Sequence, residues 1–194
     1  RENDKTALIA IDRTGKNVVR HSYADLDRLS NRFANALMTL GAEKGDFAFV
    51  MIPRIVEWYQ VLLGCTKTGV VAMPGTNLLT AKDIEYRINR ADARLAIVTA
   101  EHAEKVEEIR GNCPSLEYLI LIGDERAGWV TLENMCALEI DNVDRAALPP
   151  TRADEDMLIY FTSGTTRMPK MVCRDHGYAL AHSITGDYWM DLRE

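Results

Sequence analysis

Short, continuous apolar segments alternate with helical patterns along most of this chain of 194 residues. The segments lack polar alternation, as do strands that are buried on both faces. They are FAFVMI (47–52), VVAM (70–73), LAIVT (95–99) and YLILI (118–122). Alternation of strands with helices is typical of parallel sheets covered by helices. The sequence therefore predicts an α/β fold class with a layered, mostly parallel sheet flanked by helices.

Helix start and stop signals support this assignment. Ser22, followed by Asp25, predicts an N-cap, and Gly41 predicts the end of the same helix. Thr80 and Thr131 are predicted to cap two later helices.

The polar segment 139–156, with Pro149-Pro150 near its centre, interrupts the alternation and predicts a surface connector. It separates an expected N-terminal α/β subdomain (1–138) from 157–194, where two strands (157–162 and 169–174) precede a helix. We interpret 157–194 as the start of the rest of a larger domain.

Composition excludes several partners. The net charge of −6 comes without a basic stripe, so we expect no nucleic acid partner. No apolar run approaches the ~18 residues of a membrane-spanning helix, and no signal peptide is visible. The four cysteines show no CxxC pair and no metal-ligand spacing with histidine, which predicts free thiols and a cytoplasmic location.

The stretch YFTSGTTRMPK (160–170) is the strongest candidate for a binding site. Its hydroxyl groups, a glycine that admits a close ligand and a lysine suit a polyphosphate. These candidates are Thr162, Ser163, Gly164, Thr165, Thr166 and Lys170. The spacing excludes a Walker P-loop, a dinucleotide fingerprint and a nucleophile elbow. A plain surface turn is the alternative, since such loops are often rich in these residues.

The extended stretch YFTSGTTRMPKMV resembles the phosphate-binding signature of the adenylate-forming enzymes, which include acyl-CoA synthetases, luciferases and adenylation domains. SYADLDRLSNRFANAL (22–37) and MIPRIVEWYQVLLGCTKTGVVAMPGT (51–76) are similar to earlier blocks of that superfamily. PRIVEW, MPGT, DIEYRI (83–88) and 169–189 are most like medium-chain acyl-CoA synthetases. The similarity covers nearly the whole chain.

This resemblance implies an ATP-dependent ligase that joins a carboxylic acid to coenzyme A through an acyl-adenylate. The substrate class is a medium-chain, branched or aromatic acid. The residues from Thr162 to Thr166, with Lys170, would hold the β- and γ-phosphates of ATP. Thr165 or Thr166 would lie near Mg²⁺. His176, six residues after Lys170, is a candidate site residue, with a capping or packing role as the alternative.

Arg167 departs from the signature, which has Gly or Ser at this position. Three interpretations remain open: Arg167 adds positive charge near the phosphates, it points to solvent, or it strains a backbone that requires φ > 0. The departure puts tight ATP binding in doubt but not the fold.

Members of the superfamily carry further catalytic elements downstream, so the sequence indicates an N-terminal fragment that is inactive alone. Two other interpretations stay open: a non-catalytic nucleotide- or partner-binding module, and an acetyl- or aryl-CoA ligase. Tyr178, Tyr188 and Trp189 are expected in the core, or alternatively in an acyl pocket. Exposed apolar surface is expected where the rest of the domain would pack, and it would favour self-association.

Overall fold

A seven-stranded sheet forms the centre of the computed structural model, which describes residues 4–12, 14–137, 140–144, 147–162 and 168–191. The strand order is β7-β6-β5-β3-β4-β8-β9. Every neighbouring pair is parallel except β8 and β9, which are antiparallel. The strands are β3 (Phe47–Met51), β4 (Val71–Pro74), β5 (Leu95–Thr99), β6 (Tyr118–Ile122), β7 (Val130–Thr131), β8 (Asp156–Thr162) and β9 (Lys170–Asp175). The predicted fold class is confirmed.

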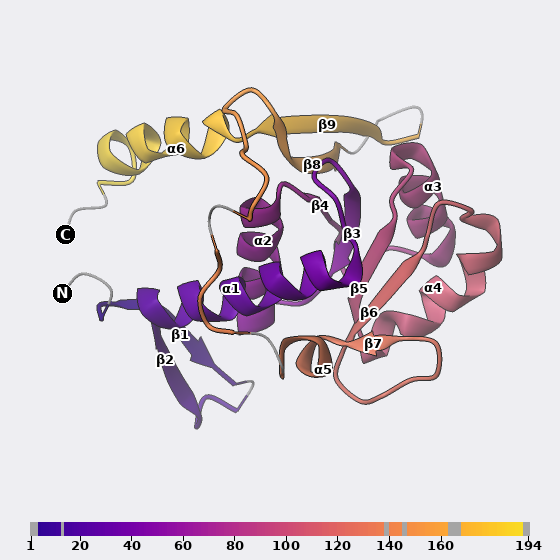
Figure 1. The fold of residues 1–194 in the computed structure, drawn as a ribbon, viewed down its shortest axis with the longest axis horizontal. Helices are drawn as coiled ribbons and strands as arrows, with labels where there is room; N and C mark the ends of the chain where they lie inside the picture. The colour runs from indigo at the N-terminus through magenta and orange to yellow at the C-terminus, as the bar shows by residue number, and fades with distance from the viewer. Residues whose placement is uncertain (1–3, 13, 138–139, 145–146, 163–167, 192–194) are drawn as a thin grey trace.

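Helices cover both faces of the sheet (Figure 1). They are α1 (Tyr23–Leu40), α2 (Val56–Thr68), α3 (Ala81–Ala91), α4 (Ala103–Ile109), α5 (Leu132–Ala137) and α6 (Gly177–Tyr188). Phe49 and Met51 face the cluster built with α3 and α4, whereas Ala48 and Val50 face the one built with α1 and α2. This alternation explains why β3 is apolar throughout: successive side chains enter opposite cores.

The predicted caps are confirmed. Ser22 and Asp25 form a reciprocal capping box at α1, and Gly41 ends that helix at φ 92°. Thr80 forms a second capping box at α3. The Thr131 hydroxyl accepts a hydrogen bond from the amide of Asn134 at 3.2 Å in α5. These local patterns determine the helix boundaries because each satisfies backbone groups that the helix leaves unpaired.

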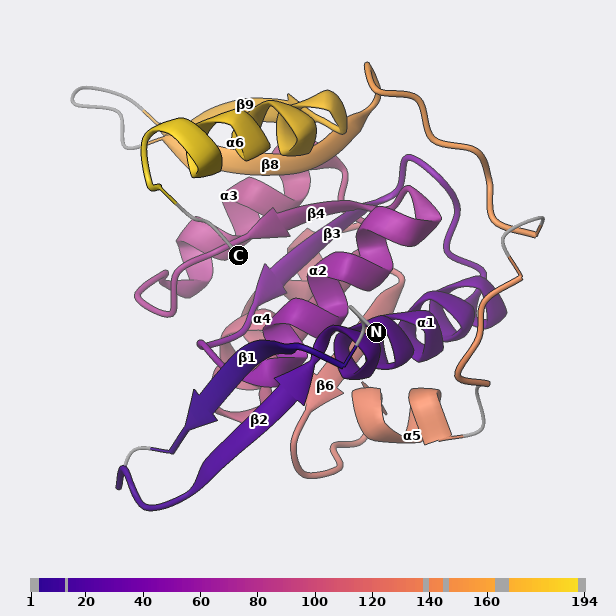
Figure 2. The same cartoon turned by 90° about the vertical axis from the view of Figure 1, so that its left-hand side faces the viewer.

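A hairpin near the N-terminus was not predicted. β1 (Thr6–Ile11) and β2 (Val18–Ser22) pair antiparallel in a sheet of their own (Figure 2). Side chains of both apolar and polar type are half-buried or exposed there. The apolar run ALIAI (7–11) of β1 is as continuous as the runs of the central strands, so the signal for this strand was present and was missed, whereas β2 (VVRHS) mixes apolar and polar residues.

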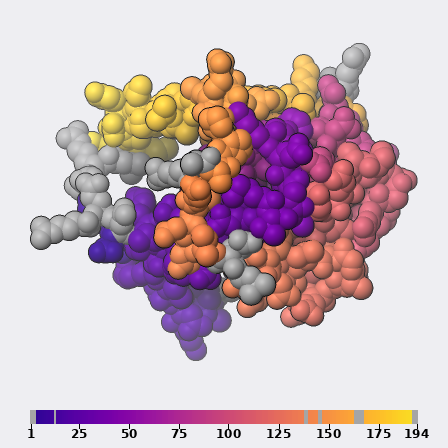
Figure 3. Space-filling view, in the orientation of Figure 1, coloured from indigo at the N-terminus to yellow at the C-terminus, as the bar shows by residue number. Residues whose placement is uncertain are grey.

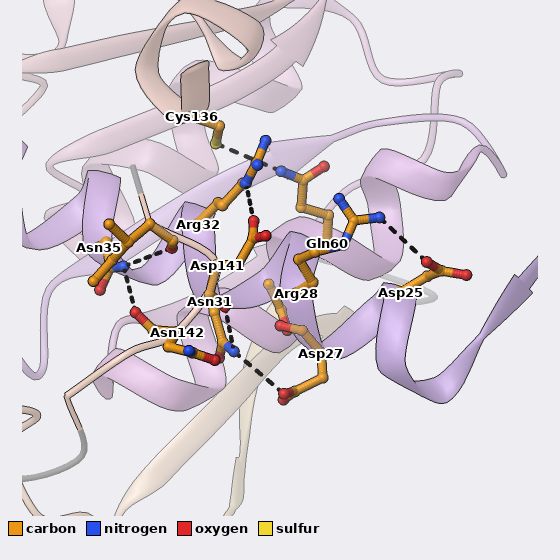
Figure 4. A network of polar contacts seen from close by, with 12 residues as sticks. Asp25, Asp27, Arg28, Asn31, Arg32, Asn35, Gln60, Cys136, Asp141 and Asn142 are labelled. Atoms are coloured by element: carbon orange, nitrogen blue, oxygen red, sulfur yellow. Dashed lines mark hydrogen bonds and ion pairs between the residues drawn. The ribbon is translucent and has the colours of Figure 1, made fainter. Parts of the chain in front are cut away.

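The connector lies across α1 and is held by polar side chains of that helix (Figures 3 and 4). The amide of Asn31 donates to the carbonyl of Asp141 at 2.9 Å, and the amide of Asn35 donates to the carbonyl of Asn142 at 3.2 Å. Arg32 pairs with the Asp141 carboxylate at 2.5 Å. Asn31 and Asn35 are buried on α1, so these bonds fix the route by which the chain reaches β8.

The last helix differs from the expectation of a packed core. Tyr188 and Trp189 are 87% and 85% exposed, and Leu180 and Ile184 are also largely exposed. Tyr178 is exposed as well. The predicted core position of Tyr178, Tyr188 and Trp189 is therefore wrong for this chain, while the prediction of exposed apolar surface is confirmed. Figure 1 shows the reason: α6 extends beyond the sheet and is not covered by another described element.

Candidate functional site

The candidate phosphate loop leaves the sheet at the edge where α/β proteins bind ligands. β8 is parallel to β4, with Leu158 opposite Ala72, so the C-terminal end of β8 lies at the carboxyl edge of the parallel strands. Ligands of open α/β sheets bind outside this edge. The loop joins two strands, as predicted from the apolar pattern after Pro169. Ser163, Gly164, Thr165, Thr166 and Arg167 lie outside the described residues.

Thr162 and Lys170 flank the loop and lie directly opposite each other in the antiparallel ladder. Directly opposed residues project to the same face of a sheet. Both side chains are exposed. The structure thus brings together a hydroxyl group and an ammonium group, which are suitable donors for the oxygens of a phosphate.

The other face of the hairpin end packs against α3. Phe161 and Met171, each adjacent in sequence to a candidate residue, contact the core cluster that contains Ile84 and Ile88 of α3. Because side chains alternate along a strand, Thr162 and Lys170 project to the opposite face. The candidate donors therefore remain uncovered by this helix.

Two α3 side chains contact the ends of the loop. The Tyr86 hydroxyl donates to the carbonyl oxygen of Pro169 at 3.0 Å, and its ring lies edge-on to Phe161 at 6.1 Å between centroids. The Arg87 guanidinium lies 5.1 Å from the centre of the Phe161 ring. Burial lowers the pKa of Arg87, although Asp83 acts in the opposite direction. Sequence reasoning missed these contacts, since helix periodicity does not indicate which distant strand a side chain meets.

His176 lies at the other end of the hairpin. Asp156 and Asp175 form the ladder pair there, roughly 17 Å along the strand from Lys170 at 3.3 Å per residue. The His176 side chain borders a hollow of about 440 Å³ lined also by Lys44 and Glu155. The structure does not bring His176 together with Thr162 and Lys170.

The expected capping role of His176 belongs to its neighbour. His176 occupies the N-cap position of α6 without a side-chain hydrogen bond to the helix. Instead, the Asp175 carboxylate accepts a hydrogen bond from the amide of Tyr178 at 2.9 Å. The capping role of His176 is therefore wrong, whereas its packing role and its site role stay predictions.

Side chains that can bind a metal ion, the cysteines among them, occur in the described residues of the chain. No group of three or more His, Cys, Asp or Glu side chains there is arranged to hold a metal ion. The four cysteines are free thiols, as predicted, and Cys173 is the exposed one. Among these residues, the donors at the hairpin end suit an anion better than a cation.

Comparison with known proteins decides the family. The model of the AMP-binding enzyme family matches residues 1–193. The chain belongs to the AMP-binding enzyme family. This confirms the resemblance to adenylate-forming enzymes that the loop and the earlier blocks indicated.

Relatives of this AMP-binding chain are acyl-CoA synthetases and ligases. It is 37% identical to the mitochondrial acyl-coenzyme A synthetase ACSM4 of Mus musculus over 90% of the chain and 30% of the relative. It is 38% identical to an uncharacterized acyl–CoA ligase of Bacillus subtilis (strain 168), over 98% of the chain and 35% of the ligase. The chain thus spans about a third of the length of these curated relatives.

Solved structures support the fold. The crystal structure of the anthranilate CoA ligase AuaEII in complex with anthranoyl-AMP superimposes with a TM-score of 0.87 and 26% identity, over 96% of this chain and 35% of that one. An acyl-CoA synthetase of Brucella canis gives a TM-score of 0.85 at 22% identity, over 98% of this chain and 34% of that one. No helix in the described ranges has the length and apolar character that crossing a bilayer requires.

Proposed function

We propose that this AMP-binding chain supplies the pyrophosphate-binding part of an ATP-dependent acyl-CoA synthetase. The overall reaction converts a carboxylic acid, ATP and coenzyme A into acyl-CoA, AMP and pyrophosphate. One observation carries the proposal: Thr162 and Lys170 form a cross-strand pair at the carboxyl edge of the sheet. Family membership and the names of the relatives add support.

The chemistry explains why such a pair is needed. A carboxylate is a poor electrophile because its charge repels nucleophiles, so its oxygen attacks the α-phosphorus of ATP and pyrophosphate leaves. The thiol of coenzyme A then attacks the activated carbonyl and releases AMP. The transition state of phosphoryl-type transfer is stabilised mainly by positioning and charge. The Lys170 ammonium and the Thr162 hydroxyl would bind the departing phosphates, and Ser163, Gly164, Thr165 and Thr166 would complete the cradle.

Magnesium fits this site only as a partner of the nucleotide. Mg²⁺ is often held by one or two carboxylates together with substrate phosphates. The hairpin end supplies hydroxyl and ammonium groups, so the phosphates would bring most ligands and Thr165 or Thr166 would complete them. When bound, Mg²⁺ neutralises charge on the leaving pyrophosphate.

The acid substrate is proposed from the relatives. A medium-chain acid follows from the blocks shared with medium-chain synthetases. An aromatic acid is the alternative, since the similar anthranilate CoA ligase is crystallised with anthranoyl-AMP. An acetyl-specific ligase and a non-catalytic nucleotide-binding module are further alternatives, and the Arg at position 167 gives the latter some weight.

The cellular location of the protein and the association of its copies with one another are also proposals. Free thiols support the cytoplasm, whereas the mouse synthetase ACSM4 is named as mitochondrial. Self-association is supported by the apolar side chains that are exposed on α6 and at its C-terminal end, because large exposed apolar patches mark interaction sites. These side chains are Leu180, Ile184, Tyr188 and Trp189.

Calorimetric titration of Mg-ATP and of Mg-pyrophosphate into the chain tests the proposal. The variant Lys170→Met should weaken both by about tenfold or more, because a charge-assisted contact to phosphate is lost. Lys16→Met, in the exposed turn of the N-terminal hairpin, is the matched control and should change nothing. Equal affinities for the three proteins would count against a phosphate site here.

Catalysis is tested separately. We expect no carboxylate-dependent ATP–pyrophosphate exchange from the 194-residue chain alone, because the resemblance places further catalytic elements outside it. An exchange signal from this chain would overturn that expectation and show that it holds a complete adenylation site.

A further inference from the structure

We propose that Tyr86 is a positioning residue for Lys170, acting through the carbonyl group of Pro169. The proposal rests on the proposed function, since it assigns how α3 holds the end of that same site. The hydrogen bond and the ring contact of Tyr86 are made with Pro169 and Phe161, the neighbours of Lys170 and Thr162. Tyr86 fixes the backbone at the residue before Lys170, and thereby the position from which the ammonium group reaches a phosphate.

The geometry supports a tether at this point. The hydroxyl of Tyr86 donates to the Pro169 carbonyl at 3.0 Å, although 83 residues separate them in sequence. The same ring contacts Phe161, the residue before Thr162, with centroids 6.1 Å apart. One side chain therefore contacts Phe161 of β8 and Pro169, which directly precedes β9, and these two residues are the sequence neighbours of Thr162 and Lys170.

The tether is anchored to a rigid part of the molecule. Ile84 and Ile88, which lie on either side of Tyr86 in α3, are fully buried in the core. The capping box of Thr80 and Asp83 fixes the start of the helix. A hydrogen bond from a helix held in this way keeps the Pro169 carbonyl at a fixed position relative to the core. A water molecule bound to that carbonyl would not hold it in place.

The tether also leaves the ligand face open. Phe161 and Met171 face α3, and the alternation of side chains sends Thr162 and Lys170 to the other face. Arg87 reinforces the contact on the α3 side, with its guanidinium 5.1 Å from the centre of the Phe161 ring. α3 thus supports the hairpin end from behind without competing for phosphate.

Tyr86→Phe isolates the hydroxyl group, because it keeps the ring against Phe161. Tyr59→Phe is the matched control, since Tyr59 lies on α2 and its ring contacts Trp58. The rate of amide hydrogen exchange, measured by NMR, reports on the hydrogen bond between Tyr86 and Pro169 without any ligand. β9 is an edge strand, so only one of the adjacent amides of Lys170 and Met171 is directed at β8. We expect Tyr86→Phe to accelerate exchange of that protected amide by about fivefold, the effect of one lost hydrogen bond. Exchange at Phe49 and Ile97 in the core should stay unchanged.

A second measurement separates positioning from stability. We expect Tyr86→Phe to weaken Mg-pyrophosphate binding by about three- to tenfold with little change in the thermal midpoint, and Tyr59→Phe to leave both unchanged. Unchanged exchange of the protected amide would overturn the tether, whatever the ligand affinities. Faster exchange with unchanged affinity would overturn the positioning role. If neither the present chain nor Arg167→Gly binds pyrophosphate, the proposed function is refuted instead, and the exchange data still decide whether the tether exists.

Discussion

Gly64 of α2 lies directly against the ring of Phe33 of α1. A Cβ atom at position 64 would come within 2.6 Å of Cδ1 of Phe33 and 3.2 Å of the carbonyl oxygen of Ser30. The two helices approach this closely because no side chain separates them. The contact also matters for the site, since α1 holds the connector that leads to β8.

Gly64→Ala is therefore expected to destabilise the chain by about 1–3 kcal/mol, because Phe33 is fully buried and has little room to move. The free energy of unfolding from urea denaturation measures the effect. Gly111→Ala is the control, since no atom lies within 4 Å of a Cβ there. Equal stability of the two variants would show that α1 and α2 are less tightly packed than described.

The capping box of α3 predicts a pH dependence of stability. The hydroxyl and amide of Thr80 donate to the Asp83 carboxylate at 2.7 and 3.0 Å and lower its pKa from the usual 3.8. A lowered folded pKa means that the contribution is present above about pH 4 and is lost as pH falls through the folded value. Asp83→Asn should thus cost about 0.5 kcal/mol at pH 7, and less at pH 3.

Urea unfolding of Asp83→Asn at both pH values checks this. Asp124→Asn, at an exposed position outside the capping boxes, provides the comparison. A cost for Asp83→Asn that grows on acidification would contradict a lowered pKa for this carboxylate in the folded chain.

Thiol labelling at pH 8 should find one fast cysteine. Cys173 is exposed, whereas Cys65, Cys113 and Cys136 are buried. Partial burial and the nearby Asp156 raise the pKa of Cys173 too, so its faster reaction rests on its exposure. Burial raises the pKa of Cys65 to about 12, and burial with the nearby Glu85 raises that of Cys113 to about 11. Buried thiols with raised pKa react slowly because the thiolate is the nucleophile. Four reactive thiols should appear in denaturant, and two or more fast thiols in the native chain would contradict the described burial.

The central strands and their helices were predictable because the signals are local. Continuous apolar runs such as 95–99 and caps such as Ser22 identify an element without knowledge of its neighbours. The hairpin of β1 and β2 was missed although β1 carries the apolar run 7–11, because a turn and not a helical pattern follows that run and because β2 mixes apolar and polar residues. The exposed position of Trp189 was missed for another reason: sequence periodicity shows an apolar side chain but not whether a partner covers it.

The candidate site was likewise predictable only in part. Thr162 and Lys170 were predicted from the loop composition and from the resemblance, and the ladder of β8 and β9 places them opposite each other. Tyr86 was not predicted, because its contact with Pro169 depends on the packing of α3 against a hairpin distant in sequence. His176 follows closely in sequence, but the strand direction carries it to the far end of the hairpin.

The most direct test of the phosphate site is calorimetric titration of Mg-ATP into three proteins: the present chain, Arg167→Gly, and Arg167→Gly with Lys170→Met. Glycine restores the residue of the family signature and removes any strain that a side chain imposes where φ is positive. We predict tighter binding by Arg167→Gly than by the present chain, and loss of that binding when Lys170 is also replaced. Unchanged affinity across the three proteins would contradict the assignment of this loop as the phosphate site.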